Sequence, residues 1–213
     1  MADYRAYHPM VGVMWSGCAA FCNWLSAQNG LQPCYNLTTW ACDFTKNGYR
    51  LPTEAEWEWA GRGGHTNPYF NYACGDSLEQ SRANLPTSGD PYEAGVYPQT
   101  TPVGFYDGTL KLKTSFNWPS TAASYQTLNG ANGFGLYDMH GNVAEMVADW
   151  YGRSYFSSSS SVDPKGPEQG ADRVVLGGSW GTDAVRCRAG FRRSNATSGK
   201  AYFFGFRIVC EQK

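Results

Sequence analysis

Gly177-Gly178-Ser179-Trp180 and the closing stretch Gly205-Phe206-Arg207-Ile208-Val209-Cys210 frame the last part of this 213-residue chain. We interpret both as rigid segments. The 24 residues between them, 181 to 204, mix Thr, Asp, Arg, Phe, Ser, Asn and Tyr without an obvious period. A varied stretch held between two rigid segments is typical of an active site or of a recognition surface.

The length and charge of the chain limit what it can be. A chain of 213 residues can bury one good core, and we predict a single domain over residues 1–213. The formal net charge is −1, so no global field attracts nucleic acid, and we expect no nucleic-acid partner. No apolar run approaches the length of a membrane span, so we expect no direct membrane insertion by this chain.

Seven cysteines are scattered along the chain, and none of them forms a C-x-x-C pair. Because the chain has only three histidines, the ligand spacing of a zinc site is missing. Scattered cysteines of this kind are more often buried thiols or structural disulfides than metal ligands.

Local signals predict two helices and several short strands. Apolar spacing favours a helix over residues 15–28, and a capping-box pattern at residues 53–56 begins a second helix that ends at the glycines of 61–64. The stretch 141–151 fits either a helix or a strand. Short strands are expected at 173–176, about 185–191 and 204–210; residues 65–133 are loop-rich, and 157–161 have the composition of a flexible linker. Together these elements indicate an irregular α+β domain.

Gly177 to Gly181 matches the G-x-S-x-G pattern of a hydrolase nucleophile elbow. That motif needs a helix after its serine and a later histidine, whereas no histidine follows Ser179. We therefore regard the match as accidental. The glycine-rich loops that cradle phosphates are absent as well.

Four ordered motifs carry a resemblance to a known family. They are Gly48-Tyr49-Arg50-Leu51-Pro52-Thr53-Glu54-Ala55-Glu56-Trp57-Glu58-Trp59-Ala60, then Gly135-Leu136-Tyr137-Asp138-Met139-His140-Gly141-Asn142-Val143-Ala144-Glu145-Met146 followed by Asp149-Trp150-Tyr151, then Arg173-Val174 with Gly177-Gly178-Ser179-Trp180, and the closing Gly205-Phe206-Arg207. In this order, over about residues 8–210, they resemble the formylglycine-generating-enzyme (sulfatase-modifying factor) family. The resemblance implies an elaborated C-type lectin fold.

The resemblance also allows an enzyme. Formylglycine-generating enzymes oxidise a substrate cysteine with a copper ion held by two cysteines that follow the GGS-aromatic motif. Here Cys187 lies near the second of those positions, but Thr182 occupies the first, and one thiolate cannot form a linear bis-thiolate Cu(I) site. We therefore expect no catalysis and no required cofactor. An oxidoreductase of the formylglycine-generating or sulfoxide-synthase type is the alternative, although the latter requires a histidine triad and the three histidines here are scattered without an H-x-x-x-H pair. A purely structural or carbohydrate-binding module is a third alternative, because the lectin fold alone does not specify sugar binding. Non-catalytic relatives carry a Cys-Arg pair and a closing cysteine, which implies a disulfide or close thiol pair between Cys187 and Cys210.

The arrangement of GGSW, a varied stretch and GFRIVC also resembles the variable proteins of diversity-generating retroelements, those of treponemes in particular. In these systems adenines of a template are mutated, mostly in Asn codons, which never yields Glu, Gln, Met, Trp or Lys. Residues 181–204 contain no Glu, Gln, Met or Trp and a single Lys200.

The resemblance implies a hypervariable surface that binds a protein or another macromolecular ligand. We expect Trp180, Cys187, Phe206 and Ile208 to anchor it in the core. The expected ligand-binding residues are Gly181, Thr182, Asp183, Val185, Arg186, Phe191, Arg193, Ser194, Asn195, Ser198, Gly199, Ala201, Tyr202 and Phe203. Such a protein is expected at a bacterial or phage cell surface or outside the cell, through a signal or lipid anchor that this chain does not contain.

Relatives in the family often hold structural Ca²⁺. The resemblance places one such site at Asn142, Val143 and Glu145, whose amide, carbonyl and carboxylate oxygens are suitable ligands. A second loop, at Asn84, lacks the expected acidic partner. The alternative is that Glu145 binds no calcium and only caps or pairs with other groups of the protein.

Overall fold

The computed structural model describes residues 6–64 and 69–211, so residues 65–68 of the predicted loop lie outside the described residues. The first helix, α1 (Trp15–Gln28), has the predicted bounds. Its buried face consists of Trp15, Cys18, Ala19 and Cys22, which pack into the larger core cluster. Gly30, with a φ of 68°, follows the helix in the left-handed region that glycine adopts readily.

The second helix, α2 (Glu54–Gly61), begins with the predicted capping box. The Thr53 hydroxyl accepts a hydrogen bond from the Glu56 backbone N–H, and the Glu56 carboxylate accepts one from the Thr53 N–H. Arg50 of the preceding strand β1 (Tyr49–Arg50) holds the same carboxylate through two N–O contacts of 2.6 Å. A buried guanidinium therefore fixes where this helix starts.

A four-stranded sheet in the order β6-β5-β4-β7 forms the centre of the molecule. Its strands are β4 (Ala144–Trp150), β5 (Asp172–Leu176), β6 (Arg193–Ala196) and β7 (Phe204–Gly205). β4 pairs antiparallel with β5 and parallel with β7, and β5 pairs antiparallel with β6. Within the ambiguous stretch 141–151, residues 144–150 thus form a strand, and it lacks polar alternation because both of its faces are buried.

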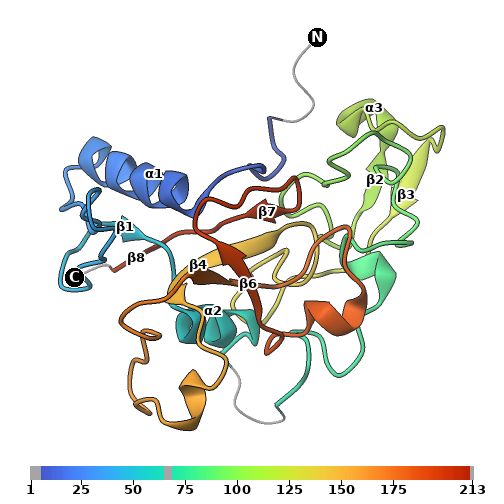
Figure 1. Cartoon of the computed structure of the whole chain (residues 1–213). Helices are drawn as coiled ribbons and strands as arrows, with labels where there is room; N and C mark the ends of the chain where they lie inside the picture. The colour runs from blue at the N-terminus through green and yellow to red at the C-terminus, as the bar shows by residue number, and fades with distance from the viewer. Residues whose placement is uncertain (1–5, 65–68, 212–213) are drawn as a thin grey trace.

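The two helices cover opposite faces of this sheet (Figure 1). Met146 and Val175 join the cluster of α1, whereas Val147, Val174 and Leu176 pack with Trp57 of α2. Neighbouring residues of one strand point to opposite faces, so this division follows from the period of two.

Two smaller sheets and several single turns complete the chain. β1 pairs with β8 (Val209–Cys210), and β2 (Leu110–Leu112) pairs with β3 (Ser124–Gln126), next to the short helix α3 (Lys113–Phe116). The 3-10 turns are η1 (Gln80–Arg82), η2 (Tyr155–Ser157) and η3 (Ala184–Cys187). The closing stretch 204–210 forms two short strands instead of one.

The strand expected at about 185–191 was wrong. Residues 184–187 form η3, because the Asp183 side chain accepts a hydrogen bond from the Arg186 N–H at 3.0 Å and so begins a helical turn.

Candidate ligand-binding surface

The Gly177-Gly178 turn fixes the start of the varied stretch. Gly177 and Gly178 have φ values of 84° and 68°, in the left-handed region. A Cβ on Gly178 would lie 2.2 Å from the Cys187 Sγ, and one on Gly177 would lie 2.9 Å from the Trp57 ring. Only glycine therefore fits at both positions, and the turn closes tightly over the core.

The same turn is bonded to the second sequence motif. The Gly141 N–H donates to the Gly177 carbonyl at 2.9 Å, and the Trp180 N–H donates to the Asn142 carbonyl at 3.0 Å. Two motifs that lie far apart in the sequence thus form one rigid support beneath residues 181–204.

Thr182 belongs to this support, which corrects its assignment as an exposed ligand-binding residue. Its side chain is 6 % exposed, and its hydroxyl lies 2.7 Å from the Ser179 Oγ while accepting the Ser179 N–H. Thr182 is buried because its hydroxyl closes the turn. Ser179 is buried too, so it is not presented to solvent as a nucleophile elbow would require.

Cys187 is fully buried, as predicted for a core anchor, but it forms no disulfide with Cys210, and the two thiols contact different carbonyl groups. The Cys187 thiol points to the Thr182 carbonyl at 3.7 Å, in a cluster with Tyr72 and Leu85. The Cys210 thiol points to the Asn47 carbonyl at 3.5 Å, beside β1. η3 turns Cys187 inward beneath the loop, away from the strand that carries Cys210.

Burial raises the pKa of the Cys187 thiol to about 12, so it carries its proton at neutral pH. His140 lies against the same residue: its Nδ1–H donates to the Cys187 carbonyl at 2.8 Å, and its Nε2 accepts the Ala73 N–H. Burial lowers the pKa of His140 to about 4. These groups form a neutral, hydrogen-bonded floor.

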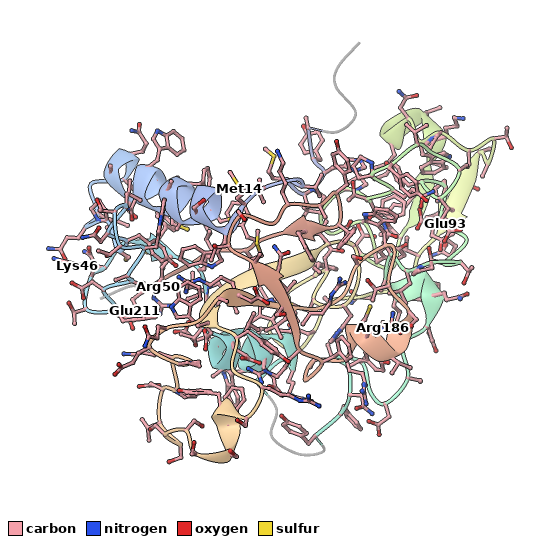
Figure 2. All side chains as sticks on the ribbon, viewed as in Figure 1. Met14, Lys46, Arg50, Glu93, Arg186 and Glu211 are labelled. Atoms are coloured by element: carbon pink, nitrogen blue, oxygen red, sulfur yellow. The ribbon has the colours of Figure 1, made fainter. Side chains whose placement is uncertain are left out.

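The other predicted ligand-binding residues lie at the surface to different degrees. The exposed ones are Gly181, Asp183, Val185, Arg186, Arg193, Ser198 and Tyr202, and the half-buried ones are Phe191, Ser194, Asn195, Gly199, Ala201 and Phe203. Arg186 on η3 is labelled in Figure 2. Val185 and Tyr202, at 60 % and 64 % exposed, are large apolar side chains held in solvent. We call residues 181–204, without the buried Thr182, Cys187, Ala189 and Phe204, the display surface.

Internal bonds hold the backbone of the display surface. β6 pairs with β5 from Arg193 opposite Val175 to Ala196 opposite Asp172. The side-chain amide of Asn195, within β6, donates to the Gly199 carbonyl at 3.0 Å. The guanidinium of Arg193 lies 5.6 Å from the ring of Phe203, whose ring also packs 4.6 Å from Phe204. The pairing of β6 with β5 orders this part through the backbone, whereas the contacts of Asn195, Arg193 and Phe203 are made by side chains of the display surface itself.

The sequence analysis missed an aromatic extension of this surface. Trp180 was expected in the core, but it is half-buried, because its ring packs against exposed Tyr97 at a centroid distance of 5.1 Å. Its indole N–H donates to the Tyr202 carbonyl at 3.3 Å. Phe206 and Ile208 pack against the core as predicted.

Next to Trp180 lies an open cavity of about 320 Å³. Its walls include Asn84, Glu93, Tyr97, Gln99, Trp180 and Gly181. Tyr97 follows Val96 in a proline-rich loop. No pattern in the sequence indicates that its ring meets Trp180, because the two residues lie far apart in the chain.

The residues expected to hold calcium are engaged with the protein itself. The Glu145 Oε2 accepts the Trp57 indole N–H at 2.6 Å and the Arg207 Nε–H at 2.5 Å, and its Oε1 accepts the Arg207 Nη2 at 2.7 Å. The Asn142 amide oxygen accepts the Thr101 N–H. Within residues 6–64 and 69–211, no three or more His, Cys, Asp and Glu side chains gather as a metal site. As they stand, these residues do not fit Ca²⁺, which would have to displace Arg207; calcium at Asn142, Val143 and Glu145 stays a prediction.

This α+β architecture, with its two helices on a small mixed sheet and its long ordered loops, is that of the formylglycine-generating-enzyme type of C-type lectin fold. The chain belongs to the family of the sulfatase-modifying factor enzyme 1-like domain, whose model matches residues 1–212.

Two curated proteins and one solved structure show what this family includes. The chain is 34 % identical over 208 residues to a protein named serine/threonine-protein kinase pkn1 from Chlamydia caviae, covering 96 % of this chain and 24 % of that protein. It is 31 % identical to the formylglycine-generating enzyme of Streptomyces coelicolor, covering 96 % and 53 %. The chain thus spans between about a quarter and about half of the length of these curated relatives.

The structure is also similar to that of Treponema denticola variable protein 1, with a TM-score of 0.71 and 28 % identity over 99 % of this chain and 73 % of that one. The family therefore contains both an enzyme and a variable protein. Among the helices of the described residues, none has the length and apolarity needed to cross a membrane.

Proposed function

We propose that this protein is a non-catalytic binding protein whose display surface recognises a protein or another macromolecular ligand. One observation carries the proposal. Between the buried residues Thr182 and Phe204, charged, apolar and aromatic side chains project into solvent from an ordered backbone. Aromatic and Arg side chains held in place lose little entropy on binding and commonly dominate binding energy.

The chemistry of the turn supports a non-catalytic role. Copper-dependent oxidation needs two thiolates, but Thr182 stands at the first position with its hydroxyl bonded to Ser179. Burial and the raised pKa keep the Cys187 thiol protonated and inaccessible. The likeness to a treponemal variable protein supports diversification by a retroelement and a location at the cell surface.

The first experiment randomises six exposed positions, namely Asp183, Val185, Arg186, Arg193, Ser198 and Tyr202, and selects binders to an immobilised stable protein such as lysozyme. We expect folded members that bind with different specificities. A matched library at the buried positions Thr182, Cys187, Ala189 and Phe204 is expected to be mostly unfolded. A library of the first kind that folds but yields no binder, or that does not fold, contradicts the proposal.

Diversification has its own test. Sequencing the 3′ end of the gene across a natural population should show substitutions confined to codons of exposed and half-buried residues in 181–204. Substitutions spread evenly over buried and exposed codons, or no variation at all, contradict the retroelement part of the proposal. Incubation with Cu(I) and a cysteine peptide of sulfatase type tests the enzyme alternative. Formation of formylglycine by the unaltered protein, with no formation by Cys187→Ala, would overturn the non-catalytic assignment.

A further inference from the structure

A buried arginine without a carboxylate partner lies on the sheet, outside the display surface. Arg173 of β5 is 4 % exposed and sits opposite Trp150 of β4. Its guanidinium carbon lies 3.4 Å from the Trp150 ring centroid and 3.6 Å from that of Trp15. Among the residues that the structure describes, no Asp or Glu pairs with it.

Only one edge of this guanidinium is bonded. Its Nη1 donates to the Ala148 carbonyl at 2.5 Å. Its Nε is buried and has no hydrogen-bond partner, and its Nη2 makes none within the described part of the chain. In a guanidinium, Nε–H and the adjacent Nη2–H point the same way, and this edge is the fork that binds a carboxylate or phosphate through two hydrogen bonds. The buried Nε–H has no partner, which is costly, whereas Nη2 is not among the buried unbonded atoms and is the donor of this edge that a ligand can reach.

Cavities lie against this residue on two sides. One of about 240 Å³ reaches toward Tyr35, Phe44 and Lys165, and one of about 230 Å³ reaches toward Thr39 and Ser198. Both cavities are lined by the same four side chains, Trp15, Trp40, Trp150 and Arg173. Each is smaller than the roughly 300 Å³ of typical small-molecule pockets, so each suits a compact group.

The charge and shape of the walls indicate the ligand. Lys165 adds a second cation to the first cavity, and exposed Glu168 is the one acidic residue of its wall. The Asp149 side chain lies against Gly166 of that wall and favours the charged form of Arg173, so it is a second carboxyl near the site. Trp40 holds its ring at both cavities from a left-handed backbone, with a φ of 61°, which is strained for a tryptophan. Flat indole walls favour a planar or apolar body next to the anion.

We propose that the Arg173 pocket binds an oxyanion, a carboxylate, sulfate or phosphate group, carried on a compact planar or apolar body. The site does not rest on the proposed function, because its four shared wall residues lie outside residues 181–204. The second cavity is also lined by Thr197 and Ser198, so the site adjoins the display surface.

The test is calorimetric titration of the protein with benzoate, sulfate and phosphate, with benzamide as the neutral match for benzoate. We expect benzoate to bind about tenfold or more tightly than benzamide, since a charge-assisted hydrogen bond contributes at least that factor. Arg173→Met should lose this preference, and Arg153→Met, which removes an exposed arginine outside both cavities and outside the display surface, should keep it. The anion that binds most tightly shows whether the site prefers a carboxylate, a sulfate or a phosphate group.

Equal binding of benzoate and benzamide, or binding of no anion at millimolar concentration, would overturn the proposal. If Arg173→Met does not fold, the comparison of benzoate with benzamide on the unaltered protein still decides. A further readout is the Nε–H resonance of Arg173 in nitrogen-15 spectra, identified by its loss in Arg173→Lys: a site that binds anions shifts it on addition of benzoate, whereas a purely structural arginine leaves it in place.

Discussion

Removing the guanidinium that holds Glu145 should destabilise the protein strongly. The Glu145 side chain is 6 % exposed, and two of its three N–H donors come from Arg207 of the closing GFR motif. Arg207→Met keeps the length and packing of the side-chain stem but leaves a buried carboxylate with the Trp57 N–H alone. Breaking a buried ion pair on one side costs about 3–5 kcal/mol, and we expect a loss of that size.

Urea unfolding at neutral pH measures this loss, and the chain offers a matched control. Arg186 and Asp183 form an ion pair at 3.7 Å with side chains 60 % and 59 % exposed, so Arg186→Met should change the free energy of unfolding by no more than about 0.5 kcal/mol. The double variant Glu145→Gln/Arg207→Met should recover part of the loss, because it no longer buries an unpaired charge. A loss below about 1 kcal/mol for Arg207→Met would refute the inference that the pair joins the C-terminal motif to the sheet.

Three further outcomes are expected. In the native protein, a thiol reagent should modify exposed Cys74 first and buried Cys187 only after unfolding; rapid modification that persists in Cys74→Ser would contradict this. Burial raises the pKa of Asp149 to about 7 from 3.8, so its stabilising contribution is complete below pH 3.8 and is lost as pH rises to 7. Relative to Asp149→Asn, the unaltered protein should therefore lose up to about 4 kcal/mol between pH 4 and 7.5, and parallel pH profiles would exclude that burial effect. EDTA should leave the melting temperature unchanged, because the Glu145 carboxylate is already bonded to Arg207. A melting temperature that falls with EDTA and recovers with Ca²⁺ would show that the protein does bind calcium.

Elements with local signals could be predicted from the sequence. The capping box of α2 depends on two residues three positions apart, so the start of this helix is readable at sight. The stretch 144–150 could not be assigned, because a strand buried on both faces shows neither period. The turn at η3 had a local signal in Asp183, whose side chain caps Arg186, but the apolar residues around it suggested a strand.

The sites depend on contacts between distant residues, and this limits what sequence reasoning can find. The exposed part of residues 181–204 was predicted because one continuous stretch supplies it. The Arg173 pocket was not, since Trp15, Trp40 and Trp150 come from three separate segments. The burial of Thr182 was missed for the same reason: it depends on a turn whose shape is set by Gly177 and Gly178.

A surface that varies in sequence requires a backbone whose shape does not depend on the varying side chains. In residues 181–204 the fixed contacts come from a few buried groups: the Thr182 hydroxyl, the Cys187 thiol and the Phe204 ring. The half-buried Arg192 lies within the display surface but also contacts the rest of the domain, because its guanidinium pairs with buried Glu54 of α2, so we expect a change there to cost more than a change at an exposed position. Changes at exposed positions between these residues typically alter stability by less than about 0.5 kcal/mol each, whereas loss of one buried hydrogen-bond partner costs about 1–3 kcal/mol. Several exposed substitutions together therefore cost no more than one buried change, and this difference is what allows the same fold to carry many surfaces.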